Sequence, residues 1–364
     1  MPHHPYKALY IHVPFCVKRC GYCDFATSAV PREDARIDSY VEQLVVDIRR
    51  LSKRGELSDI QSVYVGGGTP THIGSARLSS LLYALSVSMD LAREGLEFTV
   101  EANPESLDER LVRDIWALGV NRLSLGVQSF DDDILRLLGR AHDAQGARDA
   151  VRAAQERFEN VSIDLMCGIP GQSEEALEAS LREAIGLGVK HVSMYPLTIE
   201  PFTAFDKAVL SGQMEEPDED VEADHMQLAA RVLQEAGFHR YEVASYALPG
   251  FESKHNASYW TGVAYLGVGE HATTMTQNDE RRMRVMNGQV VDDLDRPQME
   301  AEDLMLGMRM ARGISDERLQ AAGAYLPDAH KTMQSLQEDG YVLHSDGRWR
   351  PTEQGWLCGN DLYG

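Results

Sequence analysis

Short apolar segments alternate with amphipathic segments along the first half of the chain. Six of the apolar segments are rich in β-branched residues and end at a glycine, a proline or a polar residue, which is typical of buried strands. They span residues 7–13, 60–65, 96–101, 122–128, 161–166 and 191–197. Between them, apolar residues recur every three to four positions and predict helices at residues 37–54, 105–118, 145–157 and 174–187. The pattern therefore predicts a run of six strand–helix units.

Strands that alternate with helices pair into a parallel sheet, because each helix returns the chain to the start of the next strand. Eight such units close a TIM-type barrel of about 250 residues. The pattern in this chain stops after six units. We therefore expect an α/β fold built on a partial (β/α)6 barrel that stays open.

The C-terminal third has a different pattern. Residues 237–298 combine short apolar stretches with glycine-rich loops, and helices are predicted at residues 304–311, 316–322 and 329–338. A hairpin follows over residues 340–351, with its turn near residues 345–347. Helices beside a hairpin are typical of a small winged-helix-like module. We expect three parts, which are a barrel core over residues 1–236, a segment over 237–298 that extends the barrel, and the C-terminal module over 299–364.

The chain carries 35 Lys and Arg residues against 57 Asp and Glu residues, a formal charge of −22. Proteins that bind nucleic acid usually present a basic face, so this balance argues against a nucleic-acid partner and favours a packing or protein-binding role for the C-terminal module. No stretch reaches the ~18 apolar residues of a membrane span, and the N-terminus lacks the pattern of a secretion signal. We expect a cytoplasmic protein with at most peripheral membrane contact.

Three of the five cysteines fall within eight residues. Cys16, Cys20 and Cys23 form a CxxxCxxC motif directly after the first predicted strand. Thiolates bind soft metals and iron–sulfur clusters, and three of them on one short loop can hold three corners of a four-iron cluster. A zinc site completed by His12 and a set of buried structural cysteines are the alternatives, although zinc sites usually show two separated ligand pairs.

Three other features of the sequence stand out. Asp164 lies inside an apolar segment, and a carboxylate in a buried strand is costly unless it is paired, which indicates a ligand or an ion-pair partner. The glycine run 66–68 follows the second predicted strand, where it permits a close approach of the backbone to a ligand, although a plain tight turn would also use such a run. Cys167 and Cys358 have no partner at ligand spacing, so we interpret them as a core residue and an incidental one.

The segment Tyr10-Ile-His-Val-Pro-Phe-Cys16, followed by the cysteine spacing, resembles the radical S-adenosylmethionine (SAM) superfamily. The resemblance covers nearly the whole chain from Tyr10 onward. It implies that Cys16, Cys20 and Cys23 hold a [4Fe-4S] cluster and that the amino and carboxylate groups of SAM chelate the remaining iron. It also implies an electron donor for the cluster, whose electron cleaves SAM to a 5′-deoxyadenosyl radical.

The same resemblance implies which residues bind SAM. The glycine-rich run contacts its amino group, a glutamate ends the third strand, and a glutamine and an arginine follow the fourth strand. Most of these positions lie at the C-terminal ends of strands, where TIM-type barrels carry their sites. In this sequence the implied SAM-binding residues are Tyr10, Gly67, Gly68, Thr69, Glu101, Gln128, Arg140 and Asp164.

More narrowly, the chain resembles the oxygen-independent coproporphyrinogen III oxidase (dehydrogenase) group and, within it, the haem chaperone branch of the HemW type. The dehydrogenase has a fourth cysteine where this chain has Phe25, and a long N-terminal extension, whereas Tyr10 stands near the start here. His255 begins an HNxxYW segment in which the histidine is the proposed haem contact, and a neutral imidazole is a normal axial ligand of haem iron. A solvent-facing loop histidine is the alternative.

The resemblance implies a chaperone that carries haem as cargo and delivers it to a haem-accepting protein of the respiratory chain, with SAM either cleaved or only bound. The alternative is a coproporphyrinogen III oxidase of porphyrin biosynthesis, and the acidic charge disfavours an RNA-modifying enzyme. The loop 267–272 departs from the small-residue pattern of the group at Glu270 and His271. No SAM or haem role therefore carries over to this loop, and His271 stays an unassigned candidate.

Overall fold

The computed structural model describes residues 3–359 of the chain. Six parallel strands form the centre of the molecule, and they lie in the order in which they occur in the sequence. They are β1 (Ala8–Val13), β4 (Ser62–Gly67), β5 (Glu97–Ala102), β6 (Arg122–Gln128), β7 (Asn160–Cys167) and β8 (His191–Pro196). Each begins and ends within two residues of a predicted segment, so the predicted partial (β/α)6 barrel is confirmed.

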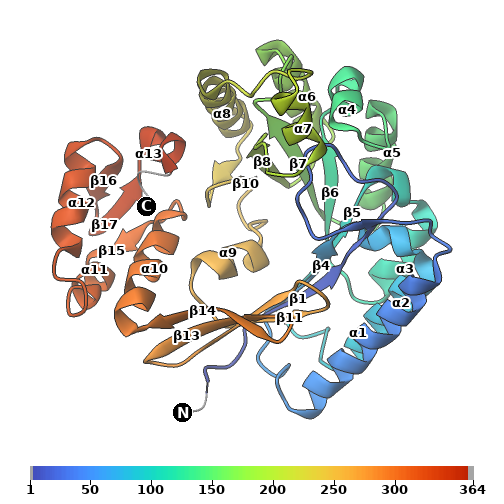
Figure 1. Ribbon diagram of the computed structural model, residues 1–364, viewed down its shortest axis with the longest axis horizontal. Coiled ribbons are helices and arrows are strands. Elements are labelled where there is room, and N and C mark those ends of the chain that lie inside the picture. The colour runs from blue at the N-terminus through green and yellow to red at the C-terminus, as the bar shows by residue number, and fades with distance from the viewer. Residues whose placement is uncertain (1–2, 360–364) are drawn as a thin grey trace.

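Helices α1 to α6 connect these strands and cover the outer face of the curved sheet, and α7 and α8 follow β8 (Figure 1). Their apolar residues point inward at helical spacing, as in the first helix, where Ile37, Val41, Leu44 and Ile48 are buried. The helices are α1 (Ala35–Lys53), α2 (Ser75–Ser86), α3 (Glu109–Ala117), α4 (Asp132–Leu138), α5 (Ala144–Gln155), α6 (Glu174–Gly186), α7 (Ala204–Leu210) and α8 (Glu219–Glu235).

Residues 237–298 extend the sheet at both edges. β9 (His239–Arg240) and β10 (Ser245–Ala247) add to β8 in antiparallel fashion. At the other edge β11 (Tyr265–Val268) pairs in parallel with β1, and β12 (Thr273–Gln277), β13 (Arg281–Met286) and β14 (Gln289–Asp295) follow as an antiparallel meander. The sequence predicted short strands here but not their partners, because a short strand carries no signal for the edge that it joins.

The C-terminal module is a separate group of elements (Figure 1). It contains α10 (Arg296–Met308), α11 (Asp316–Ala322), α12 (Ala329–Glu338), α13 (Glu353–Leu357), and a three-stranded sheet of β15 (Ile314–Ser315), β16 (Val342–Ser345) and β17 (Arg348–Pro351). The predicted hairpin and the helices at 316–322 and 329–338 are all present. The module has its own small apolar core, which includes Met308, Leu319 and Trp349.

Two helices begin four or more residues away from their predicted starts. α10 begins at Arg296, eight residues earlier than expected, because Asp295 and Gln298 form a reciprocal capping box at its N-terminus. α3 begins at Glu109, four residues later than expected, because the Asp108 side chain accepts a hydrogen bond from the backbone N–H of Leu111. In both cases a capping side chain decided the boundary, and the apolar spacing alone did not reveal it.

A short helix, α9 (Lys254–Trp260), lies at the amino end of the barrel strands. The carboxylate of Glu97, the first residue of β5, accepts hydrogen bonds from the backbone N–H groups of Lys254 and His255, each at 2.9 Å, and from the Ser253 hydroxyl at 3.2 Å. The helix therefore covers the end of the barrel opposite to the cysteine loop. Within residues 3–359, no helix has both the length and the apolar content to cross a bilayer.

Candidate functional site

A cavity opens at the carboxyl ends of the parallel strands, beneath the cysteine loop. Ten of the twelve residues predicted to bind the cluster, SAM or haem line it, from the loop after β1, from β4 to β7 and from the loop after α4. They are Cys16, Cys20, Cys23, Gly67, Gly68, Thr69, Glu101, Gln128, Arg140 and Asp164. The other two, Tyr10 and His255, do not reach this cavity.

The three thiols sit on a loop that a small sheet closes at its base. Cys16 lies in β2 (Phe15–Cys16), which pairs with β3 (Ser28–Ala29), and Cys20 and Cys23 lie between these strands. All three cysteines are free and partly exposed. Burial raises the pKa of Cys16 to about 11. Its thiolate therefore needs a nearby cation, which bound iron would provide.

The geometry does not fit the alternative of a zinc site with His12. Both ring nitrogens of His12 already have partners, since Nδ1 lies 2.9 Å from the Tyr10 hydroxyl and Nε2 lies 3.0 Å from the Ala26 carbonyl oxygen. In the described part of the chain, no three His, Cys, Asp or Glu side chains converge on a single metal ion. The thiols instead line one shared cavity, which fits a cluster whose irons each take a different thiolate.

The guanidinium of Arg140 ties the cysteine loop to the barrel. Its Nη1 donates to the sulfur of Cys20 at 3.3 Å and to the hydroxyl of Tyr22 at 3.5 Å. Its Nη2 donates to the carbonyl of Gly126 at 2.6 Å and to Oδ1 of Asn103 at 2.7 Å. The buried Nε has no hydrogen-bond partner among the described residues, so one donor stays available to a bound molecule.

A second set of hydrogen bonds reaches Cys16. Asn103 donates through Nδ2 to Oγ1 of Thr69 at 2.8 Å, and this hydroxyl donates to the Cys16 sulfur at 3.5 Å. Two of the three thiols are therefore hydrogen-bonded to one continuous network. Such outer contacts orient metal ligands and stabilise their negative charge.

The glycines after β4 are required by close packing. A Cβ at Gly67 would lie 2.3 Å from Nδ1 of His12, and Gly67 has a φ of +113°. A Cβ at Gly68 would lie 2.8 Å from the backbone nitrogen of Phe15. The run therefore lets β4 and the cysteine loop approach each other while its backbone lines the cavity.

Glu101 and Asp164 are the two carboxyl groups of the cavity. Glu101 accepts a hydrogen bond from the Tyr64 hydroxyl at 2.6 Å and one from the backbone N–H of Gly67 at 3.0 Å. Burial, with a smaller contribution from the charge of Asp164, raises the pKa of Glu101 to about 7. Burial also raises the pKa of Asp164 to about 6, against a hydrogen bond with Ser193. The protonation state of both groups therefore changes near neutral pH, and a positively charged ligand would favour their ionised forms.

Gln128 is directed into the cavity by an irregularity at the end of β6. The pairing of β6 with β7 shifts register between Leu125 and Gln128, and Gln128 has a φ of +69°. Residues other than glycine seldom adopt this backbone conformation, and those that do cluster at binding sites.

His255 lies deep in the barrel interior and is 1% exposed. Its Nδ1 pairs with the Ser62 hydroxyl at 3.0 Å, its Nε2 pairs with the Tyr259 hydroxyl at 3.1 Å, and its ring stacks on Tyr64 at 4.9 Å between centroids. Burial lowers its pKa to about 3, so the ring is neutral. It is neither a loop residue nor exposed to solvent, and both ring nitrogens have partners. Its role as a haem contact stays a prediction.

Tyr10 lies close to this group. Its hydroxyl pairs with Nδ1 of His12, and its ring stacks on Tyr64 at 6.2 Å between centroids. Because Tyr64 donates to Glu101, Tyr10 and His255 are connected to the cavity through one side chain. Their influence on a bound molecule would be indirect.

Sequence reasoning missed Asn103 and Tyr22, which complete the network around Arg140. Asn103 stands two residues after Glu101, and its place next to a predicted SAM contact is the signal that could have identified it. Tyr22 lies between two of the cysteines. Nothing in its local pattern distinguishes it from an exposed loop tyrosine.

Comparison with known proteins places this site in a family context. Residues 10–184 match the radical SAM superfamily, and residues 294–358 match the HemN C-terminal domain. The solved structure of coproporphyrinogen III oxidase (HemN) from Escherichia coli superposes with a TM-score of 0.80 over 99% of this chain and 89% of that chain, at 21% identity. At that identity the match shows a shared fold.

Relatives of higher identity cover nearly the whole chain. The heme chaperone HemW of Bacillus subtilis is 32% identical, with 98% of each chain covered. The heme chaperone HemW of Haemophilus influenzae is also 32% identical, over 100% of this chain and 98% of its own. A mitochondrial radical S-adenosyl methionine domain-containing protein 1 from Danio rerio is 34% identical over 87% of this chain and 76% of its own. The chain belongs to the radical SAM superfamily and, within it, to the HemW family.

Proposed function

We propose that this protein is a haem chaperone of the radical SAM type, which binds haem and delivers it to haem proteins of respiration. The observation that carries the proposal is the similarity to proteins named heme chaperone HemW, which extends over 98% of both chains in the Bacillus subtilis relative. A similarity of that extent includes the barrel, the segment that extends it and the C-terminal module.

Membership of the radical SAM superfamily implies a [4Fe-4S] cluster and SAM as cofactors. We assign the cluster to Cys16, Cys20 and Cys23, because these thiols line one cavity together. When bound, the cluster and SAM would supply one-electron chemistry. Arg140 and Thr69 would donate hydrogen bonds to the thiolates and stabilise their charge.

We assign the rest of the cavity to SAM. The backbone of Gly67, Gly68 and Thr69 forms one side, and Glu101 can accept hydrogen bonds from a ribose or an ammonium group. The other assigned residues are Gln128, Arg140 and Asp164, which line the cavity, and Tyr10, which acts through His12 and Tyr64.

The partners that follow are haem as cargo, a haem-accepting respiratory protein and an electron donor for the cluster. His255 is the predicted haem contact, but it is buried with both ring nitrogens engaged. Haem could reach it only after α9 moves away from Ser62 and Tyr64.

The alternative function, a coproporphyrinogen III oxidase, has weaker support. The structural match to HemN carries the fold and no activity at 21% identity. Phe25 replaces the fourth cysteine of the dehydrogenase pattern, is 64% exposed and lines the cluster cavity. An apolar ring at this place favours the chaperone.

Anaerobic reconstitution with iron and sulfide, followed by a haemin titration, tests the proposal. We expect the parent chain to gain a brown chromophore, to bind haemin, and to transfer it to a haem-depleted respiratory protein. Serine at position 16, 20 or 23 should remove the chromophore. Cys167→Ser is the matched control, because Cys167 is buried in the core of β7, and it should keep the chromophore. A chain that holds the cluster but binds no haemin contradicts the chaperone function.

A further inference from the structure

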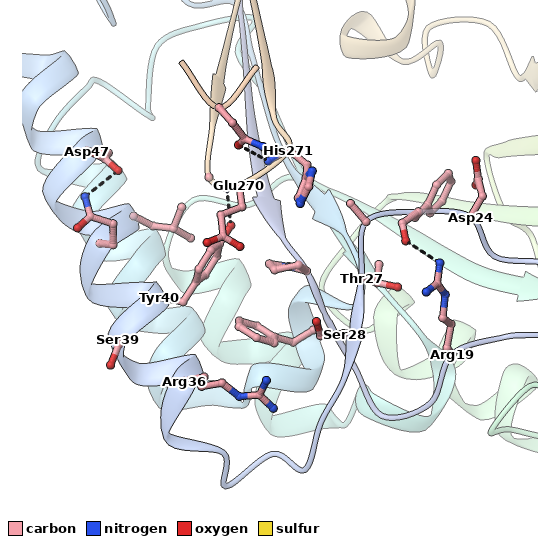
Figure 2. A pocket seen from close by; sticks show the side chains of 18 residues that line it. Arg19, Asp24, Thr27, Ser28, Arg36, Ser39, Tyr40, Asp47, Glu270 and His271 are labelled. Carbon is pink, nitrogen blue, oxygen red and sulfur yellow. Dashed lines mark hydrogen bonds between the residues drawn. The ribbon is translucent and has the colours of Figure 1, made fainter. Parts of the chain in front are cut away.

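A second and larger cavity lies on the outer side of the chain segment that follows Cys23. Its volume is about 890 Å³, near the upper end of the range for small-molecule and cofactor sites. Figure 2 shows its three walls, which are α1 with Arg36 and Tyr40, the loop between β11 and β12 with Glu270 and His271, and the segment that carries Asp24 and Thr27. None of the residues assigned to the cluster or to SAM lines this cavity.

The walls offer apolar and aromatic surface to a broad, flat ligand. Phe15 and Leu44 are buried at its base, and the ring of Tyr40 packs edge-to-face on Phe15 at 5.3 Å between centroids. Phe25 is 64% exposed at its rim. An exposed aromatic ring of this size is costly in water and gains free energy when a ligand covers it.

His271 extends from its loop towards the cavity, and its backbone is held while its imidazole is free. The backbone N–H of His271 donates to Oδ1 of Asn287 at 2.9 Å, and the neighbouring N–H of Glu270 donates to the Tyr40 hydroxyl at 3.0 Å. Among the described residues, the His271 ring nitrogens have no hydrogen-bond partner. A fixed backbone that presents an unpaired imidazole to a cavity suits an axial ligand of haem iron.

The cavity is lined by two arginines, Arg19 and Arg36, and by three carboxylates, Asp24, Asp47 and Glu270. Arg36 donates to the carboxylate of Asp34 through Nε and Nη2, and its Nη1 has no hydrogen-bond partner within residues 3–359. Arg19 donates to the carbonyls of Cys23 and Phe25 through Nε and Nη2, and in the same described part of the chain its Nη1 has no partner either. Figure 2 shows Asp47 and Glu270 away from Arg36 and Arg19, and it shows Asp24 on the same side of the cavity as Arg19. The remaining donors of the two arginines are the groups of the cavity that can bind carboxylates of a ligand.

We propose that haem binds in this cavity with His271 as an axial ligand and with its propionates directed towards Arg36 and Arg19. This inference rests on the proposed function and gives the cargo a site other than His255. Arg19, Phe25 and Thr27 line both this cavity and the cluster cavity. One segment of chain therefore separates bound haem from the cluster. A ligand in either cavity would contact this segment of the cysteine loop.

Haemin titration of the reconstituted full chain tests the site, with three variants and two controls. His271→Gly removes the ligand without backbone strain, because His271 has a φ of +63° that glycine adopts readily. Ser39→Trp fills the cavity from α1, whereas Val46→Trp, at an exposed α1 position outside the cavity, is its control. His330→Ala, an exposed histidine on α12, controls for non-specific coordination by surface histidines. His255→Ala tests the competing assignment.

We expect His271→Gly and Ser39→Trp to weaken haemin binding by about tenfold or more, while the three others bind as the parent does. Added imidazole should restore the parent Soret band to His271→Gly and leave Ser39→Trp unchanged, a rescue that a merely structural role would not give. If His271→Gly binds with the parent's affinity and spectrum, or if His255→Ala alone loses binding, the site is wrong while the chaperone function stands. If the parent chain binds no haemin, the proposed function itself fails.

Discussion

Arg140 places Nη1 3.3 Å from the sulfur of Cys20, although the two residues are 120 positions apart in the sequence. The same guanidinium donates to the carbonyl of Gly126 in β6, so it connects the cysteine loop to the rigid sheet. A cationic donor beside a thiolate stabilises the extra negative charge of a reduced cluster.

We therefore expect Arg140→Gln to shift the cluster potential to more negative values and to weaken the binding of the cluster by roughly tenfold, which lowers the iron content after reconstitution. Arg140→Lys keeps the charge but loses the planar fork, so its effect should be intermediate. Redox titration and iron and sulfide analysis measure both. Arg148→Gln, on the outer face of α5, is the control. A potential and iron content equal to those of this control would contradict the role of Arg140.

The site could be predicted from the sequence because its motifs follow parallel strands. The carboxyl ends of such strands meet at one edge, so Gly67, Glu101 and Gln128 had to converge once the strand order was known. The contact between Arg140 and Cys20 could not be read in the same way, because it depends on how two loops fold over that edge.

The unpredicted parts share one physical cause, which is pairing between distant segments. The contact of β11 with β1 and the placement of His255 under Tyr64 each depend on which surface a short element covers. The HNxxYW segment suggested a role for His255 but did not reveal that this residue is buried. The cavity beside His271 likewise exists only because the loop after β11 packs on Tyr40 of α1.

Glu97 should be important for stability, because its carboxylate accepts three hydrogen bonds at the start of α9. Glu97→Ala leaves these buried donors without a partner, which should lower the free energy of unfolding by roughly 2–4 kcal/mol. Glu97→Gln keeps an acceptor oxygen and should lose less. Urea unfolding followed by circular dichroism measures the difference. Glu94→Ala, at an exposed position nearby, should be neutral, and an equal loss in both would refute the capping role.

The protein should not oxidise coproporphyrinogen III. Phe25 stands in the cluster cavity where the dehydrogenase pattern has a polar, oxidisable cysteine. A radical reaction also depends on holding the substrate carbon in near-attack geometry, which the replaced side chain would alter. An anaerobic assay with reductant, SAM and substrate should give no protoporphyrinogen above a control without protein. Turnover of even a few equivalents would move the chain into the oxidase class.

SAM binding should strengthen as the pH rises through about 7, the pKa to which burial and Asp164 raise Glu101. A raised carboxyl pKa means that the protonated form dominates below this pH. The ionised form, which accepts hydrogen bonds from ribose or ammonium, dominates above it. If only the ionised form binds well, the apparent dissociation constant should rise about tenfold between pH 8 and pH 6. Equilibrium dialysis of SAM against the reconstituted protein measures this.

Two variants separate Glu101 from other titrating groups, including those of SAM itself. Glu101→Gln keeps the acceptor oxygen but cannot ionise, so the step near pH 7 should disappear. Asp164→Asn removes a charge that raises the pKa of Glu101, so the step should remain but move to lower pH. A step of unchanged position and size in Glu101→Gln would show that another group controls SAM binding. If that group were Asp164, the step would disappear in Asp164→Asn.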